Sequence, residues 1–329
     1  MIDCKTDTSM ICLSYDQALA ETRQLIADTL IQAPPVIRPY TSFLARGSGK
    51  MLRASGVLLC ALDGDLAIHP DAVRMAAAIE IIHLASLVHD DVIDNAGLRR
   101  GRPTLNRQAG NKKAVICGDY LLSRSFKIVS RIPDPQGYLN VKFADYIGSL
   151  CLGELNQLIN NSNFHMTPLS YFRIIKGKTA ALFEASFLAG ALTGGVPESE
   201  LGTYCRLGHT IGMIFQLTDD CMDFEAGEDE AGKNTHSDYE QNVITLPLIF
   251  AMKSDPEFKA ELLAAEEGGN KLSRRQINRQ VIGARGLQKT RRVVWKYGEK
   301  ALRMMDQLEL SEEKRCQLET LLQKAMRQA

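Results

Sequence analysis

Apolar residues recur along nearly the whole chain at the three- and four-residue spacing of an α-helix. No sustained alternation of apolar and polar residues predicts a β-strand. Proline and glycine pairs, such as Pro34-Pro35 and Gly194-Gly195, mark turns between the periodic segments. The pattern predicts helices over Tyr15–Ile31, Arg38–Arg46, Lys50–Leu62, Asp71–Asn95, Lys112–Arg131, Gln136–Asn160, Pro168–Thr193, Glu198–Phe224, Glu240–Lys253, Arg274–Ile282, Leu287–Leu308 and Ser311–Arg327.

The predicted fold is all-α, a single large helical bundle. No break between helices is long enough for an interdomain linker, and no segment repeats at the period of a solenoid. We therefore expect one domain over residues 1–329. Ser311 is expected to cap the last helix, because its hydroxyl can accept a backbone hydrogen bond and two glutamates follow it in the first turn.

Composition limits the possible partners. The chain is 45% hydrophobic and 24% charged, which is ordinary for a globular protein. Its 39 Lys and Arg balance its 39 Asp and Glu, so net charge gives no sign of a broad nucleic-acid or membrane-surface patch. We expect no nucleic-acid partner, and any anionic ligand must be bound by local cations or a metal.

Targeting signals are not evident. The N-terminus has no basic segment followed by an apolar core, which argues against a secretory signal. The longest apolar stretch is interrupted by Glu80 and His83, so no stable membrane span is expected. The eight cysteines form no C-x-x-C pair or zinc-finger spacing, which is typical of thiols in a reducing compartment. We expect a cytoplasmic protein.

Two acidic clusters end apolar helical runs. Each has the pattern Asp-Asp-x-x-Asp, so its outer carboxylates lie four residues apart on one helix face. One such cluster is often only a solvated helix surface, but two are much harder to explain in that way. Neither has the ligand spacing or central Gly of an EF-hand, whereas Mg²⁺ binds a few carboxylates and completes its shell with phosphate oxygens. The predicted metal ligands are Asp90, Asp91, Asp94, Asp219, Asp220 and Asp223.

Basic residues accompany both clusters. Each alone is typical of a surface charge, but together they could bind two diphosphate groups, one directly and one through metal-bound carboxylates. These residues are Lys50, Arg53, Arg99, Arg100, Lys178 and Lys233.

At these residues the sequence resembles the trans-isoprenyl diphosphate synthase (polyprenyl synthetase) family. The resemblance runs from about Ser42 to the C-terminus. Its motifs include S-G-K-M-L-R at Ser48, H-D-D-V-I-D at His89, G-E-L-N-Q at Gly153, G-K-T at Gly177 and F-Q-L-T-D-D-C-M-D at Phe215. It implies a helical bundle around a central cavity, with the Asp clusters facing each other and three Mg²⁺ ions on an allylic diphosphate.

The resemblance also implies a role for each matched residue. The main metal ligands and catalytic residues would be Asp90, Asp94 and Asp219, supported by the other three aspartates. The allylic diphosphate would be bound by Arg99, Lys178 and Lys233, and isopentenyl diphosphate by Lys50, Arg53, His83 and Arg100. Thr179, Gln157 and Gln216 match polar positions near the substrates. The implied reaction is prenyl transfer: the allylic diphosphate ionises, isopentenyl diphosphate attacks the cation, and a proton is lost.

One departure from the family pattern concerns assembly. The usual Gly-Lys-x-Thr-Leu-Pro is replaced by Asn242-Val243-Ile244-Thr245-Leu246-Pro247, so one lysine contact is missing. This variation is closest in style to the catalytic component of two-component hexaprenyl and heptaprenyl diphosphate synthases. The chain is therefore expected to form a homodimer, or a heterodimer with a small regulatory subunit.

Other functions compete with this interpretation. A class I terpene cyclase also binds diphosphate through an Asp-rich motif, but it would not need the second set of cations. A non-catalytic scaffold subunit would be expected to lose acidic ligands, yet all six aspartates are present. A short-chain farnesyl or geranylgeranyl diphosphate synthase is the third alternative.

Product length is predicted from the helix before the first cluster. Ala85 and Ser86 lie about one turn before Asp90, and residues 71–91 contain no Phe, Tyr or Trp. Short-chain members commonly place an aromatic floor in this region. The small side chains therefore predict a product of about C30–C40, unless they are small only because another helix packs closely there.

Overall fold

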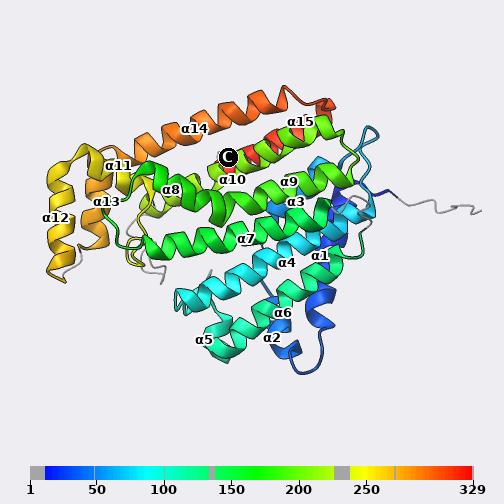
Figure 1. Cartoon of the computed structure of the whole chain (residues 1–329), viewed down its shortest axis with the longest axis horizontal. Coiled ribbons are helices and arrows are strands. Elements are labelled where there is room, and N and C mark those ends of the chain that lie inside the picture. Colours follow the sequence, from blue (N-terminus) through cyan, green and yellow to red (C-terminus); the bar gives the residue numbers. More distant parts are fainter. Residues whose placement is uncertain are drawn as a thin grey trace, which may run out of the picture.

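Helices pack side by side through most of the molecule (Figure 1). The computed structural model describes residues 12–47, 49–99, 101–132, 138–225, 238–269 and 272–327. The predicted all-α class is confirmed. Within the described residues the only named strands form a two-stranded antiparallel hairpin that pairs Leu98 with Pro103 and Arg99 with Arg102.

The elements follow one another in chain order. They are α1 Tyr15–Ile31, α2 Arg38–Leu44, α3 Leu52–Ala61, α4 Pro70–Ile93, β1 Leu98–Arg99, β2 Arg102–Pro103, α5 Leu105–Ala109, α6 Asn111–Val129, α7 Tyr138–Ile159, α8 Pro168–Ile175, the π-helical turn η1 Lys176–Ala180, α9 Ala181–Thr193, α10 Glu198–Glu225, α11 Leu246–Ser254, α12 Pro256–Glu267, α13 Arg274–Gly283, α14 Gly286–Met305 and α15 Glu312–Met326.

Local sequence signals explain where several helices begin. Ser14 and Ser273 each form a reciprocal capping box with a glutamine three residues later. Ser311 accepts a hydrogen bond from the backbone N–H of Lys314, so the predicted cap of the last helix is confirmed.

Helix α4 lies at the centre of the bundle. It packs against α1, α3, α6 and α9, so a helix apolar on most of its faces is buried by its neighbours. By length and composition α4 is also the one described helix that could cross a membrane, but 61% of its most apolar window is buried inside the protein. The central position of α4 accounts for its apolar character.

Two glycines allow a close crossing between α7 and the π-helical turn. A Cβ on Gly153 would lie 2.1 Å from the backbone nitrogen of Lys178, and one on Gly177 would lie 2.7 Å from the carbonyl oxygen of Ser149. Only residues without a side chain permit this approach. The crossing places the end of α7 directly against the turn that carries Lys178 and Thr179.

The observed elements differ from the prediction in several places. The helix predicted from Glu240 begins instead at Leu246, because Asn242 adopts a left-handed conformation (φ 68°) and Pro247 starts a new helix. The hairpin and α5 were not predicted, because each is too short for its periodicity to stand out. Helix α12 was also not predicted, although Asp255 and Pro256 are a clear start signal for it. The predicted helix Pro168–Thr193 is interrupted by the π-helical turn.

Candidate active site

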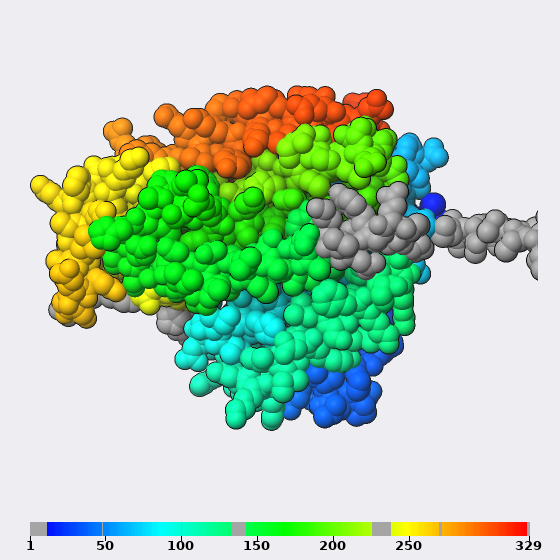
Figure 2. Space-filling model, viewed as in Figure 1, coloured from blue at the N-terminus to red at the C-terminus, as the bar shows by residue number. Residues whose placement is uncertain are grey.

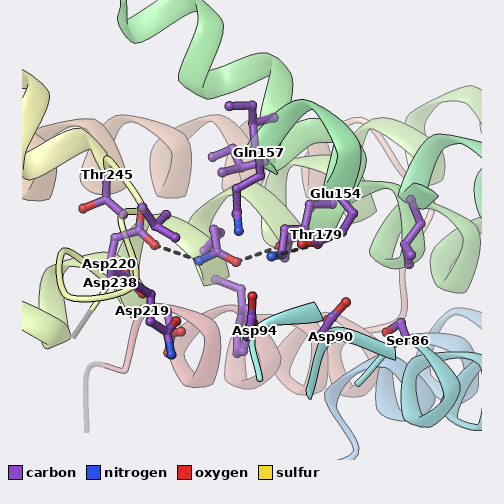
Figure 3. Close-up of a pocket in the computed structure, with 18 of the residues that line it drawn as sticks. Ser86, Asp90, Asp94, Glu154, Gln157, Thr179, Asp219, Asp220, Asp238 and Thr245 are labelled. Carbon is purple, nitrogen blue, oxygen red and sulfur yellow. Dashed lines mark hydrogen bonds and ion pairs between the residues drawn. The ribbon is translucent and has the colours of Figure 1, made fainter. Parts of the chain in front are cut away.

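A cavity of about 520 Å³ lies between helices from widely separated parts of the chain. Figure 3 shows Asp90 and Asp94 projecting from α4 toward Glu154 and Thr179, with Asp219, Asp220 and Asp238 at one end of the same space. The two Asp clusters predicted from sequence therefore contribute to one site.

The aspartates of the first cluster have two different environments. Asp90 and Asp94 line the cavity, one helical turn apart at the end of α4. Burial, and then the nearby charge of Glu154, raise the pKa of Asp90 to about 7. Asp91 points elsewhere: it is 6% exposed and forms an ion pair with Arg99, Nε to Oδ1, at 2.8 Å. Asp91 thus positions a basic residue that lines the cavity.

The aspartates of the second cluster are arranged differently. Asp219 lines the cavity and is half-exposed, so its carboxylate is accessible to a ligand. Asp220 is buried and accepts hydrogen bonds from the Tyr171 hydroxyl and from Gln216 Nε2, the latter at 2.7 Å. Burial raises the pKa of Asp220 to about 7. Asp223 does not line the cavity; it accepts hydrogen bonds from the backbone of Asp238 and from Arg274.

The π-helical turn brings Lys178 and Thr179 into the cavity wall. Lys178 Nζ lies 2.8 Å from Glu154 Oε2, across the glycine crossing described above. Thr179 donates a hydrogen bond of 2.7 Å to Gln216 Oε1 and so joins the network around Asp220. A single π-type turn in a longer helix is frequent at functional sites, because it changes the direction of the side chains it carries.

More cations reach the cavity from the start of the chain. Lys50 and Arg53 line it beside His83 of α4. The Arg53 guanidinium is buried, lies 4.6 Å from the centre of the Phe183 ring, and has its pKa lowered to about 10 by burial. Its Nε has no hydrogen-bond partner among the described residues and is itself buried.

Arg327, just after the last helix, also reaches the site. Its Nη2 lies 2.6 Å from Asp219 Oδ1, and its guanidinium lies 5.9 Å from the centre of the Phe215 ring. The residue adopts a left-handed backbone conformation (φ 49°) and lines the cavity. In this state the side chain neutralises the most accessible carboxylate of the second cluster.

The structure brings most of the predicted site residues together. Those that line the cavity are Lys50, Arg53, His83, Ser86, Asp90, Asp94, Arg99, Gln157, Lys178, Thr179, Gln216, Asp219 and Asp220. Arg100 and Lys233 lie outside the described residues. The roles of all these residues remain predictions.

Several cavity residues were not singled out from the sequence. Glu154, Tyr171, Asp238 and Arg327 line the site, and Asp238 is a further buried carboxyl whose pKa is raised well above its usual range by burial. Glu154 belongs to the G-E-L-N-Q motif at Gly153, which contributed to the family resemblance. That motif was the one sequence signal that could have identified Glu154 as a site residue. The others come from segments with no distinctive spacing.

The two residues proposed to set product length are placed differently. Ser86 lines the cavity, whereas Ala85 is completely buried in the core and does not line it. Four residues of helix turn through about 400°, which returns Ser86 to the face of Asp90, but five turn through about 500° and carry Ala85 to another face. The part of the prediction that concerned Ala85 is therefore corrected: this side chain packs against neighbouring helices.

Comparison with known proteins agrees with this geometry. The sequence matches the polyprenyl synthetase family over residues 34–281. The chain belongs to the polyprenyl synthetase family. It is a prenyltransferase, a polyprenyl diphosphate synthase similar to enzymes that make medium-length and long chains.

Three similar proteins illustrate the relationship. The heptaprenyl diphosphate synthase component 2 of Geobacillus stearothermophilus is 36% identical over 272 residues, which cover 82% of this chain and 83% of the relative. The structure of a decaprenyl diphosphate synthase from Rhodobacter capsulatus has a TM-score of 0.86, with 31% identity, and covers 95% and 96% of the two chains. A polyprenyl synthase from Caulobacter crescentus, complexed with calcium and isoprenyl diphosphate, has a TM-score of 0.84 at 28% identity and covers 94% of each chain.

The residues of this polyprenyl synthetase fit a divalent metal. Asp90, Asp94 and Asp219 supply oxygen donors. Partial burial and the neighbouring charges of Glu154 and Asp94 raise the pKa of Asp90, and these conditions favour a cation beside it. Within the described part of the chain, no three acidic, His or Cys side chains converge on one point. Such a site suits a hard cation that completes its shell with water and phosphate oxygens.

We predict that the metal-free protein loses stability as Asp90 ionises. Its pKa in the folded protein is raised from 3.8 to about 7, so its contribution to stability is present below pH 3.8 and is lost as pH rises through 7. Asp90→Asn cannot ionise. In EDTA at pH 8, urea denaturation should show it to be more stable than wild type by roughly 1–3 kcal/mol, with little difference near pH 4.

The exposed Asp65→Asn is the control and should not reproduce this effect. An equal dependence of unfolding free energy on pH in wild type and Asp90→Asn would contradict the assignment.

We also predict that a divalent metal competes with Arg327 for Asp219. Removal of a partly exposed ion pair of this kind should tighten metal binding in the absence of substrate by roughly two- to fivefold. Calorimetric titration of Arg327→Ala with Mg²⁺ measures the change. Lys324→Ala removes an exposed charge from the last turn of α15 and serves as the control. Unchanged affinity in Arg327→Ala would show that the ion pair does not oppose the metal.

Proposed function

We propose that this enzyme condenses isopentenyl diphosphate with an allylic diphosphate in a Mg²⁺-dependent reaction that gives an all-trans product of about C30–C40. The observation that supports it is a single cavity with carboxylates at one side, several cations around them and an apolar wall behind. Asp90, Asp94 and Asp219 form the acidic side.

Two groups of cations suit two diphosphates. Lys178 and Arg99 line the cavity near Asp90 and Asp94, and both influence the pKa of those carboxyls, so they are suited to bind the allylic diphosphate beside the metal. Lys50, Arg53 and His83 come from other elements and are suited to bind isopentenyl diphosphate. Two separate sets of this kind favour a two-substrate condensation over a class I terpene cyclase.

The chain's own residues would lower the barrier by electrostatics. Negative charge develops on the departing diphosphate as the allylic carbon–oxygen bond breaks, and Lys178 and Arg99 are already charged and held in position before that charge appears. Bound Mg²⁺ would supply Lewis-acid stabilisation of the same charge. We propose three ions when substrate is bound, in line with the family resemblance.

An apolar wall would protect the allylic cation. Leu150, Ile174, Leu182 and Phe215 also line the cavity, and each is buried or half-buried. These side chains exclude water, which would otherwise quench the cation before the isopentenyl double bond attacks it. They also provide the surface against which the growing chain packs.

Assembly is proposed from exposed apolar side chains on two helices. Ile116 on α6 is 62% exposed, and Leu152, Leu155 and Ile159 on α7 are between 52% and 69% exposed. Both helices lie on the face seen in Figure 2. Large apolar side chains of this kind are typical of a subunit interface. The partner is a second copy or, as the "component 2" name of one relative suggests, a smaller subunit. We further propose a cytoplasmic enzyme with one catalytic domain.

The first experiment measures turnover by the purified chain. Incubation with isopentenyl and farnesyl diphosphates should release pyrophosphate with Mg²⁺ and not in EDTA. Asp219→Ala should lower kcat by at least roughly a hundredfold, since it removes a proposed ligand of the metal ion. The circular dichroism spectrum of the variant should remain that of a helical protein. Asp65→Ala is the exposed control.

Near-normal turnover in Asp219→Ala would contradict the metal assignment. Full activity of the chain alone would contradict an obligatory small subunit. The homodimer would then be the assembly that agrees with the result. No activity alone, restored by a partner, would support the heterodimer.

The second experiment tests product length at Ser86. The tail should extend from the metal site along α4, past Ser86 and His83. Ser86→Phe places a ring in this path and leaves the metal ligands intact, so the variant should stop at farnesyl- or geranylgeranyl-sized products. Thin-layer chromatography of the dephosphorylated products measures the length of the prenyl chain. Ser86→Ala is the control and should retain the long product. The same distribution from Ser86→Phe would show that the tail follows another path.

A further inference from the structure

Helix α14 runs along the outer edge of the bundle, at the top of Figure 1, and the same edge is visible in Figure 2. It packs against α10 and α11 through one face, which includes the buried residues Thr290, Val294, Ala301 and Met305. The remaining face is solvent-exposed over a helix of 20 residues.

This exposed face is strongly basic. Helix α14 contains six Lys and Arg, and Glu299 is its one acidic residue. The segment Arg274–Arg303 contains ten Lys and Arg and no other acidic residue, although the whole chain has as many acidic as basic residues. The excess of basic residues is therefore concentrated in α13 and α14.

Several of these cations are not engaged within the protein. Arg291 forms an ion pair with Glu225, and Lys300 lies 5.9 Å from the centre of the Tyr297 ring. Arg292, Lys296 and Arg303 are exposed and form no ion pair with any described residue. Their spacing of four and seven residues places them on one face of the helix.

An exposed tryptophan lies on the same face. Trp295 is 55% exposed, and Leu302, two turns along, is 39% exposed. Exposure of the largest apolar side chain beside three cations needs an explanation, since burial would otherwise stabilise the fold. Tryptophan among lysine and arginine is typical of surfaces that contact the headgroup region of a bilayer, where its ring is apolar and its N–H can donate a hydrogen bond.

We propose that the outer face of α14, defined by Arg292, Trp295, Lys296, Leu302 and Arg303, docks on an anionic lipid bilayer. Complementary charge argues for this partner, because basic residues held near an anionic leaflet are attracted to it. A straight helix about 30 Å long presents these side chains to a flat surface. The paired apolar side chains favour lipid over nucleic acid, whose phosphates would need only the cations.

Docking at this face would also serve the reaction. A polyprenyl product carries a long apolar tail that water solvates poorly, and lipid is the phase that accepts it. This advantage rests on the proposed function, but the docking itself rests only on the charge and on Trp295. The test uses neither substrate nor metal, so its failure is distinct from failure of the prenyl transfer.

The test exploits the fact that Trp295 is the one tryptophan of the chain. The full-length protein is mixed with vesicles of phosphatidylcholine, or of an equal mixture of phosphatidylcholine and phosphatidylglycerol. Tryptophan emission should shift to the blue with the anionic vesicles alone, be quenched by brominated lipid, and return toward its original position in high salt.

The variant Arg292→Gln/Lys296→Gln/Arg303→Gln should bind anionic vesicles at least about tenfold more weakly. The matched control, Arg107→Gln/Lys112→Gln/Lys127→Gln, removes the same number of exposed charges from α5 and α6, on the opposite side in Figure 1, and should bind like wild type. Circular dichroism should show that both remain folded.

Four results would overturn the proposal. They are no emission shift with anionic vesicles, equal binding to neutral vesicles, equal loss in both triple variants, and tighter binding to a duplex DNA oligonucleotide than to the vesicles. The last would assign the face to nucleic acid.

Discussion

The cost of withdrawing several carboxyl groups from water is the constraint on which the active site depends. Asp90, Asp220 and Asp238 all have pKa values raised by burial, and no ordinary fold gathers such groups without compensation. The protein supplies part of it from its own donors: Tyr171 and Gln216 satisfy Asp220, and Lys178 offsets the charge near Asp90. The remaining negative charge lies at the carboxylates that line the cavity, where the proposed divalent metal would offset it. Without such a cation, this concentration of carboxyl groups lowers the stability of the fold.

Helix geometry explains which aspartates of the first cluster reach the cavity. Residues four apart share a face, so Asp90 and Asp94 both line it, while Asp91 forms an ion pair with Arg99. In the second cluster the same spacing does not decide the outcome: Asp219 lines the cavity, but Asp223, four residues on, accepts hydrogen bonds from Arg274 and from the backbone of Asp238. The aspartates that do not face the ligand are not redundant, because they fix the elements and cations that surround it.

The basic face of α14 is not apparent from the net charge of the whole chain. A net charge of zero gave no sign of a broad basic surface. The excess of basic residues between Arg274 and Arg303 becomes a face only because α14 buries its opposite side against α10 and α11. The helical period and the packing together determine where charge is exposed, and neither is contained in a total count.

The sequence by itself determined the helical class, most helix positions, the two Asp clusters and the cations around them, because these depend on periodicity and on local spacing. It could not determine which members of a cluster face the ligand, since Asp91 and Asp223 match the motif as well as Asp90 does. Glu154, Tyr171 and Arg327 joined the site only through contacts between elements far apart in the chain: Tyr171 with Asp220, and Arg327 with Asp219. Ala85 and Ser86 are both small and adjacent in sequence, yet helix rotation buries one in the core and turns the other to the cavity. The order of the residues determines which chemical groups lie close together along the chain. The packing of the helices determines which of these side chains point into the cavity.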